Sequence, residues 1–407
     1  MKVILSTGIG RLYLAQSAFY LKKAGVNICV ITGWIPKHPD GFFVKIASKI
    51  TGHKNLAAGL KKRQLSDDLV TITCAFPEFF CQFLLFLSKY KLIGRKKAVV
   101  AGWSFLGWYT GFFMNKYDIA HIRSCAGSCA IKKVKRRGAK VVVDHSIAHP
   151  AYFDRHLAPE YAKHGKTCFM STTNKFWRMA IQDCHDADIV LVNSDFVKET
   201  FVDAGFDTEK IKVVYTGVRK DFFSLKKDYL ITGKMKILFT GGFGFRKGGE
   251  YILKAMQELD KLGFQYELTI VGAYNEAVGI LEKYPVKNIV LKGHVPQDDL
   301  KDYLSHADVY LFPSLCEGCA SSLMEAMAAG LPVIATRQSG APIIHKENGC
   351  LIQEASSSAI IDAVTELCQD SELREKIGLN AAKTIANDYT WEKYAEQVRD
   401  IYSKLLI

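Results

Sequence analysis

The sequence predicts an α/β protein in which two Rossmann-like, doubly wound domains face a central cleft. Three observations lead to this fold class. The chain has 407 residues, about twice the length of an ordinary domain. Short runs rich in valine and isoleucine alternate with longer helical segments, which is typical of parallel sheets covered by helices on both faces. The alternation starts again near residue 235, after a lysine-rich segment without an apolar period.

The first predicted domain spans residues 1–217 and contains six strand-like runs. They are KVILS (2–6), NICVIT (27–32), LVTITC (69–74), DIAHIR (118–123), KVVVD (140–144) and DIVLVN (188–193). The second predicted domain spans residues 218–388. The segment 216–234, at the boundary between the two domains, is the expected linker. Its strands are MKILFTG (235–241), ELTIVG (267–272), NIVLKG (288–293), DVYLFP (308–313) and PVIAT (332–336). An amphipathic helix is expected over residues 389–407.

Positive charge is concentrated in the first half of the chain. Residues 1–220 hold 34 Lys and Arg against 16 Asp and Glu, whereas the remainder holds 20 against 25. Two clusters account for much of the excess, at 89–97 and 132–137. Such a surface suits a nucleic acid, an anionic lipid or a phosphorylated substrate. Because no recognised nucleic-acid motif accompanies it, we expect no nucleic-acid partner.

Two apolar stretches lie beside these clusters. The first, residues 76–97, is rich in aromatic side chains and ends in cations, and the second, residues 98–114, has no charge over 17 residues. A membrane span needs about 20 residues. The sequence therefore leaves three alternatives for this region: a short span, two core helices, or helices that lie at an anionic membrane surface.

Cysteines and paired aspartates give no metal site. The eleven cysteines are odd in number and irregularly spaced, which favours a reducing compartment, and the pair Cys316 and Cys319 has no second ligand pair nearby. Asp186 and Asp188 form an Asp-x-Asp pattern, but they precede a strand and so lie away from the expected cleft. We expect no metal, and a protein in the cytoplasm or on the inner face of the cytoplasmic membrane.

Two loops of the second domain carry candidate binding chemistry. A glycine-rich turn after the 235–241 strand leads to Arg246 and Lys247 and then to a helix that begins near Gly249, an arrangement suited to a phosphate. Farther on, Glu317 lies in a loop, and Glu325 lies in a helix whose expected N-cap is Ser321 or Ser322. The exposed amides of residues 319–322 would then hold an anion between two carboxylates.

These loops resemble those of the family 4 retaining glycosyltransferases of the GT-B fold. The resemblance is strongest over residues 308–349. Further matching segments are 187–218, 237–248, 268–272 and 290–309. It implies a nucleotide-sugar donor, such as a UDP- or GDP-sugar, bound in the cleft between the domains. It also implies that the helix at 389–407 crosses back to the first domain.

The resemblance implies roles for individual residues. Glu317 would contact sugar hydroxyls, Glu325 the ribose, and Lys247 the pyrophosphate, with Arg246 adding charge. The amides of Gly318, Cys319, Ala320 and Ser321 would hold the sugar and the nearby phosphate, the backbone at His294 and Val295 the base, and the loop containing Gly8 and Gly10 the phosphates. From the loop at 144–150, His149 rather than His145 would face the sugar.

The sequence departs from the family pattern in three places. Gly242 stands where members usually carry an arginine, Cys319 and Ala320 stand where Phe-Gly is common, and Pro342 lacks the glutamate that often follows it. The implied reaction is transfer with retention, without a metal cofactor, to a glycan or a lipid-linked acceptor in bacterial surface or exopolysaccharide biosynthesis. The alternatives are a nucleotide-sugar epimerase and a non-catalytic carbohydrate-binding protein on the same fold.

Overall fold

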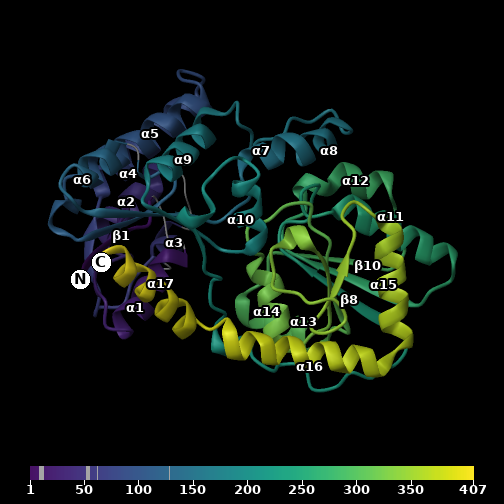
Figure 1. Ribbon diagram of the computed structural model, residues 1–407. Coiled ribbons are helices and arrows are strands. Elements are labelled where there is room, and N and C mark those ends of the chain that lie inside the picture. Colours follow the sequence, from purple (N-terminus) through teal and green to yellow (C-terminus); the bar gives the residue numbers. More distant parts are fainter. Residues whose placement is uncertain (9–12, 52–55, 62, 128) are drawn as a thin grey trace.

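The computed structural model describes residues 1–407 except 9–12, 52–55, 62 and 128. Two lobes lie side by side, each built around a parallel sheet with helices on both faces (Figure 1). The strand order is β3-β2-β1-β4-β5-β6-β7 in the first sheet and β10-β9-β8-β11-β12-β13 in the second. In each sheet the order reverses beside the first strand of the lobe, which is where open α/β sheets form ligand sites.

The first sheet contains seven strands. They are β1 (Lys2–Ser6), β2 (Asn27–Thr32), β3 (Val70–Thr73), β4 (Ile119–Arg123), β5 (Lys140–His145), β6 (Ile189–Val192) and β7 (Ile211–Val213). Its α-helices are α1 (Tyr13–Lys23), α2 (Phe42–Thr51), α3 (Leu56–Lys61), α4 (Ala75–Lys89), α5 (Arg95–Thr110), α6 (Cys129–Lys135), α7 (Pro150–Tyr152), α8 (Ala158–Ala162), α9 (Lys175–Asp186) and α10 (Asp195–Val202).

The second sheet contains six strands. They are β8 (Met235–Thr240), β9 (Tyr266–Val271), β10 (Ile289–Gly293), β11 (Val309–Phe312), β12 (Val333–Thr336) and β13 (Cys350–Ile352). The α-helices that follow are α11 (Gly249–Lys261), α12 (Val278–Lys283), α13 (Gln297–His306), α14 (Ser321–Ala329), α15 (Ser357–Gln369), α16 (Ser371–Asp388) and α17 (Trp391–Leu405). All eleven strands predicted from the sequence are present, and the edge strands β7 and β13 were missed.

Aspartates at the amino ends of strands join neighbouring strands. The carboxylate of Asp188 accepts a hydrogen bond from the Val141 amide at 2.7 Å and lies 2.9 Å from the Lys135 ammonium. Asp118 and Asp308 do the same for the amides of Lys2 and Lys236, at 2.7 and 2.8 Å. The Asp-x-Asp pattern at 186–188 therefore supplies a structural link at the end of the sheet away from the strand carboxyl ends.

The segment predicted as a linker, 216–234, packs against the second domain instead of spanning a gap. Phe222 is fully buried in that domain's core. The buried Lys226 ammonium donates to the Ala307 carbonyl at 2.6 Å and lies 3.8 Å from the Asp308 carboxylate. Nine of its 19 residues are exposed, and most of these are polar, although Leu230 is an exposed apolar side chain.

The C-terminal helix α17 leaves the second domain and packs on the first, next to α1 (Figure 1). Trp391, Tyr394, Val398 and Tyr402 are buried in a cluster with residues of β1, β2 and α1. The Tyr402 hydroxyl also makes a 2.6 Å hydrogen bond with Nδ1 of His121 in β4. The helix thus completes the core of the first domain.

The apolar stretches at 76–97 and 98–114 form the hairpin of α4 and α5. Within the described residues, no helix is both long enough and apolar enough to cross a membrane.

Candidate functional site

A cavity of about 540 Å³ lies between the two domains. Its walls come from the loops that follow β5 and β6, from the start of α14, and from the two segments that connect the domains. The lining residues are Tyr13, Gln16, Ser146, Asn193, Thr216, Gly217, Val218, Arg219, Gln297, Cys319, Ser321, Met324, Glu325 and Trp391. Three of the residues predicted from the sequence, Cys319, Ser321 and Glu325, are among them.

Glu317 is held by two cations from the neighbouring loop. Its Oε1 lies 2.6 Å from the Arg246 guanidinium and 3.3 Å from the Lys247 ammonium. Arg246 also donates to the Cys316 carbonyl at 2.7 Å, so it fixes the backbone of the loop that carries Glu317. These loops meet because β8 and β11 are neighbours in the sheet. The structure therefore brings together three predicted site residues that lie 70 positions apart in sequence.

Burial and ion pairing shift the pKa values of these groups in opposite directions. Burial raises the pKa of the Glu317 carboxyl, but Arg246 and Lys247 outweigh it, and the net pKa lies below the usual value. Burial lowers the pKa of the Lys247 ammonium, although Glu317 partly restores it. The group is an ionised carboxylate between two cations in a largely desolvated loop, where fixed charges act strongly.

The Lys247 side chain extends toward the glycine-rich turn. Its ammonium lies 4.6 Å from the centre of the Phe312 ring, and a Cβ on Gly241 would come within 3.2 Å of it. Gly241 has φ +117°, a backbone conformation that favours glycine. The turn therefore needs glycine both for its own conformation and for the approach of Lys247.

Gly318 is the point of closest approach between the two domains in this region. A Cβ at this position would overlap the Ser146 carbonyl and lie 2.8 Å from Oδ1 of Asn193. The Gly318 carbonyl in turn accepts a 2.6 Å hydrogen bond from the Ser194 hydroxyl. Only a residue without a side chain fits here, and the loop with Glu317 is thereby tied to the ends of β5 and β6.

Replacing Gly318 with alanine should therefore force the two domains apart at the cavity. The expected cost is about 1–3 kcal/mol of stability, together with loss of ligand binding in the cavity. Gly279→Ala is the matched control, because a Cβ at this exposed position in α12 meets no atom within 4 Å. Melting curves of both variants test the prediction, and equal behaviour of the two would contradict it.

The N-terminus of α14 differs from the predicted cap. The N-cap is Ala320, which has no side chain able to accept a hydrogen bond, rather than Ser321 or Ser322. The Ala320 amide donates to the Ser339 carbonyl at 3.0 Å. The reason is that the loop from Cys316 is anchored by backbone bonds to residues 338–339, so no side-chain cap is needed. Ser321 is exposed at the cavity.

Glu325 lies on α14 one turn farther into the same cavity wall. Burial raises the pKa of its carboxyl to about 7, with nearby Arg219 lowering it and Asp221 raising it. The carboxylate is therefore poised between its acid and base forms near neutral pH. It has room to accept hydrogen bonds from hydroxyl groups of a ligand in the cavity.

This raised pKa predicts a pH-dependent difference between the protein and its Glu325→Gln variant. The folded chain retains the Glu325 proton between its ordinary value of 4.5 and about 7, whereas the unfolded chain releases it. Stability from this group is therefore lost as the pH rises through that window. Relative to the parent, Glu325→Gln should gain on the order of 1–3 kcal/mol between pH 5 and pH 8. A stability difference that does not change with pH would contradict the assignment.

His149 does not line the cavity. Its ring packs against Phe201 and Phe206, with centroids 5.1 and 5.9 Å away, and its Nδ1 accepts a hydrogen bond from the Ala151 amide as the N-cap of α7. Burial lowers its pKa to about 4, so the ring is neutral. The expectation that His149 faces the sugar is therefore corrected, because the ring caps a helix and fills the first-domain core.

His145 is also buried, against Phe201, and burial lowers its pKa to about 3. From the loop at 144–150 it is Ser146 that reaches the cavity wall. Arg123 donates to the Ser146 hydroxyl at 2.6 Å and to the Asp144 carboxylate at 3.2 Å. This arrangement was not predicted, although Ser146 lies two residues after the predicted strand at 140–144, in the region where ligand-binding residues are expected.

The remaining predicted residues are spread around the second domain. His294 is exposed after the edge strand β10, and Val295 is partly buried against the core. Neither lines the cavity, whereas Gln297 at the start of α13 does. Gly10 lies outside the described residues. Asn193 was missed, and its buried Oδ1 has no hydrogen-bond partner among the described residues.

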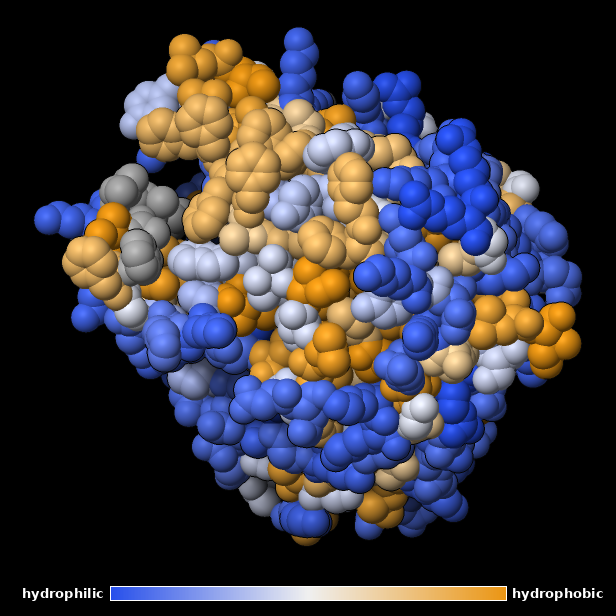
Figure 2. All heavy atoms as spheres, turned by 90° about the vertical axis from the view of Figure 1, so that its left-hand side faces the viewer, coloured by the Kyte–Doolittle hydropathy of each residue, from blue (hydrophilic) through white to orange (hydrophobic). Residues whose placement is uncertain are grey.

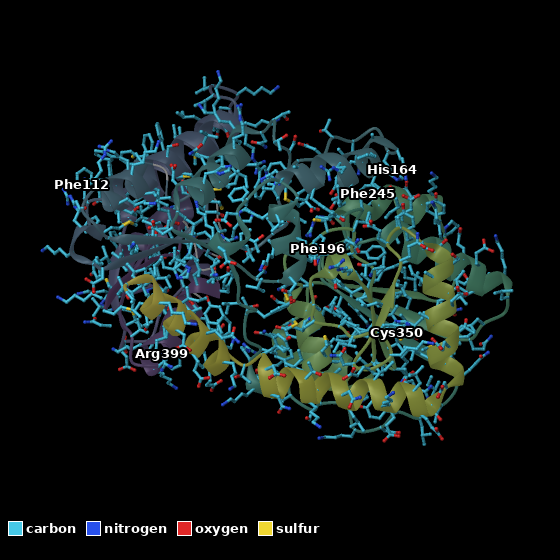
Figure 3. The ribbon with its side chains drawn as sticks, viewed as in Figure 1. Phe112, His164, Phe196, Phe245, Cys350 and Arg399 are labelled. Carbon is cyan, nitrogen blue, oxygen red and sulfur yellow. The ribbon has the colours of Figure 1, made fainter. Side chains whose placement is uncertain are left out.

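The domains also touch through α8 and the turn that follows it. His164 forms a 2.7 Å contact with the Glu250 carboxylate of α11, and its ring lies 4.4 Å from that of Phe245. Figure 3 shows these two rings together at the border of the lobes. Tyr161 donates to Glu276 at 3.1 Å. The two domains are thus in contact both at α8 and at Gly318.

Two family models divide the chain between them. The model described as Glycosyltransferase Family 4 matches residues 12–222, which is more than half of the chain, and the model described as Glycosyl transferases group 1 matches residues 221–384. The chain belongs to glycosyltransferase family 4. The boundary between the two matches falls in the segment that leads from the first domain into the second.

Individual proteins are similar to this chain over different lengths. The amylovoran biosynthesis glycosyltransferase AmsK of Erwinia amylovora is 28% identical over 231 residues, or 54% of this chain and 56% of that protein. The chain thus matches little more than half the length of this curated relative. Sucrose-phosphate synthase from Thermosynechococcus elongatus superposes over 100% of this chain and 99% of its own, with a TM-score of 0.69 and 18% identity.

A further similar structure is HepE of Anabaena, solved in complex with UDP-glucose. It superposes with a TM-score of 0.62 at 16% identity and covers 99% of this chain and 100% of that chain. At these identities the structures establish the fold only. The predicted fold class, GT-B with two Rossmann-like domains, is confirmed.

Proposed function

We propose that this family 4 protein is a retaining glycosyltransferase that moves a sugar from a nucleotide-sugar donor to a glycan or lipid-linked acceptor. One observation carries the proposal: Glu317 lies between Arg246 and Lys247 in the loop that leads into α14, and residues at the start of α14 line a cavity shared by the two domains. A carboxylate that can accept hydrogen bonds from hydroxyls, a cation that can bind phosphate and the N-terminus of a helix are thereby placed in one loop cluster. The similarity to HepE, solved with UDP-glucose, supports a UDP-sugar as donor.

In this proposal each group has one task. Glu317 accepts hydrogen bonds from sugar hydroxyls, and Lys247 binds the pyrophosphate, releasing part of its contact with Glu317. Arg246 holds both the carboxylate and the Cys316 carbonyl, so its main task is to orient the loop. Glu325, on the cavity wall, binds the ribose hydroxyls, and Gln297 replaces His294 as the side chain nearest to the base.

The proposed reaction retains the configuration of the transferred sugar. As the bond between sugar and phosphate breaks, positive charge develops on the sugar and negative charge on the leaving phosphate. Lys247, Arg246 and the amides at the start of α14 would stabilise that negative charge through groups already fixed in position. The leaving phosphate would take the proton of the acceptor hydroxyl. Because protein cations supply the charge, the proposal includes no metal cofactor.

The acceptor and the cellular setting are proposed on coarser grounds. The name of AmsK refers to amylovoran biosynthesis, and the basic first half of this chain suits an anionic acceptor or lipid. We therefore propose a step of bacterial surface or exopolysaccharide assembly that takes place in the cytoplasm, at the inner face of the membrane.

Thermal-shift measurements with UDP-, GDP- and ADP-sugars, followed by hydrolysis and transfer assays, test the donor site. We expect one nucleotide class to raise the melting temperature, and Glu317→Ala and Lys247→Ala to remove that shift. If no nucleotide-sugar binds, or if both variants bind as the parent does, the site assignment fails. Conversion of the donor to an epimer without any acceptor would favour the epimerase alternative instead.

A further inference from the structure

Exposed aromatic side chains are confined to one part of this protein. Among the described residues, ten Phe, Tyr and Trp side chains are exposed, and all ten precede residue 170. Eight of them lie on α4, α5 and the turns that follow these helices. We call these eight the aromatic face: Phe76, Phe79, Phe83, Phe86, Tyr90, Trp108, Phe112 and Phe113. Such a concentration is unusual for a protein surface in contact with water alone.

The aromatic face is continuous across the two helices. The ring of Phe105 lies 5.7 Å from Phe76 and 5.6 Å from Trp108, and Trp108 lies 4.9 Å from Phe112. On α4, Phe86 lies 4.9 Å from Tyr90. Figure 2 shows apolar side chains gathered on this side of the molecule, and Figure 3 shows Phe112 at its outer edge.

Helix α4 turns only a narrow side toward the protein. Its buried residues are Pro77, Glu78 and Cys81, and the closest approach to α5 is at Gly102, where a Cβ would lie 2.5 Å from Cys81 Sγ. Phe76, Phe79, Phe83 and Phe86 recur at three- and four-residue spacing, which places them along one side of the helix. They are between 48% and 62% exposed. The helix is therefore amphipathic, but its apolar side faces away from the protein instead of toward the core.

Cations surround the aromatic face and acidic groups are almost missing from it. Residues 76–137 contain 12 Lys and Arg but only 2 Asp and Glu. One of these acids, Glu78, is buried and paired with Arg63 at 2.5 Å, and the other, Asp118, binds the Lys2 amide. The Lys133 ammonium lies 3.8 Å from the centre of the Phe112 ring, so the charges adjoin the aromatic side chains directly.

The hairpin turn and the helix ends beside it carry five cations. Lys89, Lys91, Arg95, Lys96 and Lys97 form no ion pair with any residue that the structure describes. A cavity of about 850 Å³ opens beside Lys96 and Lys97, between α5 and residues 167–175, and is lined by hydroxyl groups and by the exposed Phe169. The edge of the aromatic face thus offers positive charge and hydrogen-bond donors to an anionic group.

We propose that the α4–α5 hairpin is a docking surface for an anionic lipid bilayer. Aromatic rings at the level of the headgroups and lysines facing lipid phosphates are the two features that bind a helix to such a surface. With 15 and 16 residues, at 1.5 Å per residue, each helix is shorter than the hydrocarbon layer of roughly 30 Å. The helices would therefore lie in the plane of the interface.

The positive charge around the aromatic face favours an anionic bilayer over a second copy of the chain as the binding partner. A dimer formed through the aromatic face would bring two strongly basic rims together, and like charges at an interface disfavour association. Anionic lipids neutralise the same rim. The lipid phosphates would occupy the cavity beside Lys96 and Lys97, while Phe79, Phe83 and Phe86 enter the headgroup layer.

The docking surface is connected through the packing of α5 to the end of β1 and the start of α9. The inner side of α5 carries Trp103, and a Cβ on Gly8, at the end of β1, would come within 2.8 Å of its ring. Trp103 also lies 5.7 Å from Phe176 at the start of α9. A bilayer bound to the outer side of α5 would thus lie across this helix from Gly8, at the end of β1.

Vesicle flotation with the full chain tests the proposal. We expect binding to vesicles in which about one third of the lipid is phosphatidylglycerol, and at least tenfold weaker binding to pure phosphatidylcholine. The triple variant Phe79→Ser, Phe83→Ser, Phe86→Ser should lose the binding, and the double variant Lys96→Gln, Lys97→Gln should weaken it roughly 25-fold, or fivefold per charge. The control is Leu262→Ser with Leu379→Ser, two side chains of the second domain that are 74% and 55% exposed.

Light scattering and fluorescence complete the test. If the triple variant abolishes a dimer of the parent and vesicles do not bind, the second copy is the occupant and the proposal is overturned. Equal binding to both kinds of vesicle, or unchanged binding of the triple variant, overturns it as well. Quenching of parent tryptophan by brominated lipid, reduced in Trp108→Phe, supports it without depending on the triple variant. Vesicle binding needs no donor, so its failure is distinguishable from failure of the proposed transfer.

Discussion

A chain that ends after Asp388, without α17, is expected not to accumulate as folded protein. The truncation removes five side chains that are at most 4% exposed from the cluster they share with β1, β2 and α1: Trp391, Tyr394, Ala395, Val398 and Tyr402. It also removes the hydroxyl that bonds His121. The single variant Trp391→Ala, which leaves a cavity in the same place, should already cost about 3–5 kcal/mol.

The control for this truncation is a chain that lacks only Leu406 and Ile407. Both side chains are exposed, at 41% and 106%, so the melting temperature should equal that of the full chain. Thermal unfolding of the two truncated chains compares them directly. A melting temperature unchanged after loss of the whole helix would show that the first domain does not depend on it.

The start of α17 lies beside residues 217 and 218, where the chain first passes from one domain to the other. The Val218 amide donates to the Tyr389 carbonyl at 2.9 Å, and a Cβ on Gly217 would overlap the Trp391 backbone. Two crossings are thus joined side by side, and both Gly217 and Trp391 line the interdomain cavity. The stability of the first domain and the shape of the cavity therefore depend on the same few residues.

Sequence patterns predicted the buried strands because burial on both faces demands a continuous apolar run. β11, for example, has four consecutive buried residues, Val309 to Phe312, and all four are apolar. The two missed strands, β7 and β13, have three residues each and lie at sheet edges, where one side needs no partner. Their sequences, IKV and CLI, are too short to differ from a loop. The limitation is therefore physical, because an edge strand is defined by its neighbour.

The candidate site was predicted as separate loops, and the contacts between loops were not. Glu317, Arg246 and Lys247 were each identified from their own surroundings, but their mutual contact depends on β8 lying beside β11. β8, the first strand of this sheet in sequence, lies in the middle of the sheet. Sequence order therefore does not show which strands are its neighbours. The direction of His149 was equally beyond the pattern, because in a loop a shift of one residue turns a side chain from the cleft to the core.

Lys247→Ala is expected to lower kcat about 10²–10³-fold, the effect typical of removing one fixed donor to a developing negative charge. The ammonium group lies 3.3 Å from the Glu317 carboxylate, and burial lowers its pKa, so it is already largely stripped of water before a phosphate arrives. Glu317 would keep Arg246 as its partner, and the fold should therefore persist. Rates of donor hydrolysis and of transfer measure the effect.

Lys261→Ala serves as the control, since this lysine lies on the same helix α11 but is 69% exposed and, among the described residues, pairs only with Glu258. It should leave kcat unchanged. A Lys247→Ala enzyme with unaltered kcat would mean that the phosphate does not contact this side chain.

Arg246→Ala distinguishes the loss of a positive charge from the loss of loop structure. That variant also removes the bond to the Cys316 carbonyl, so it should lower the melting temperature as well as the rate, whereas Lys247→Ala should lower mainly the rate.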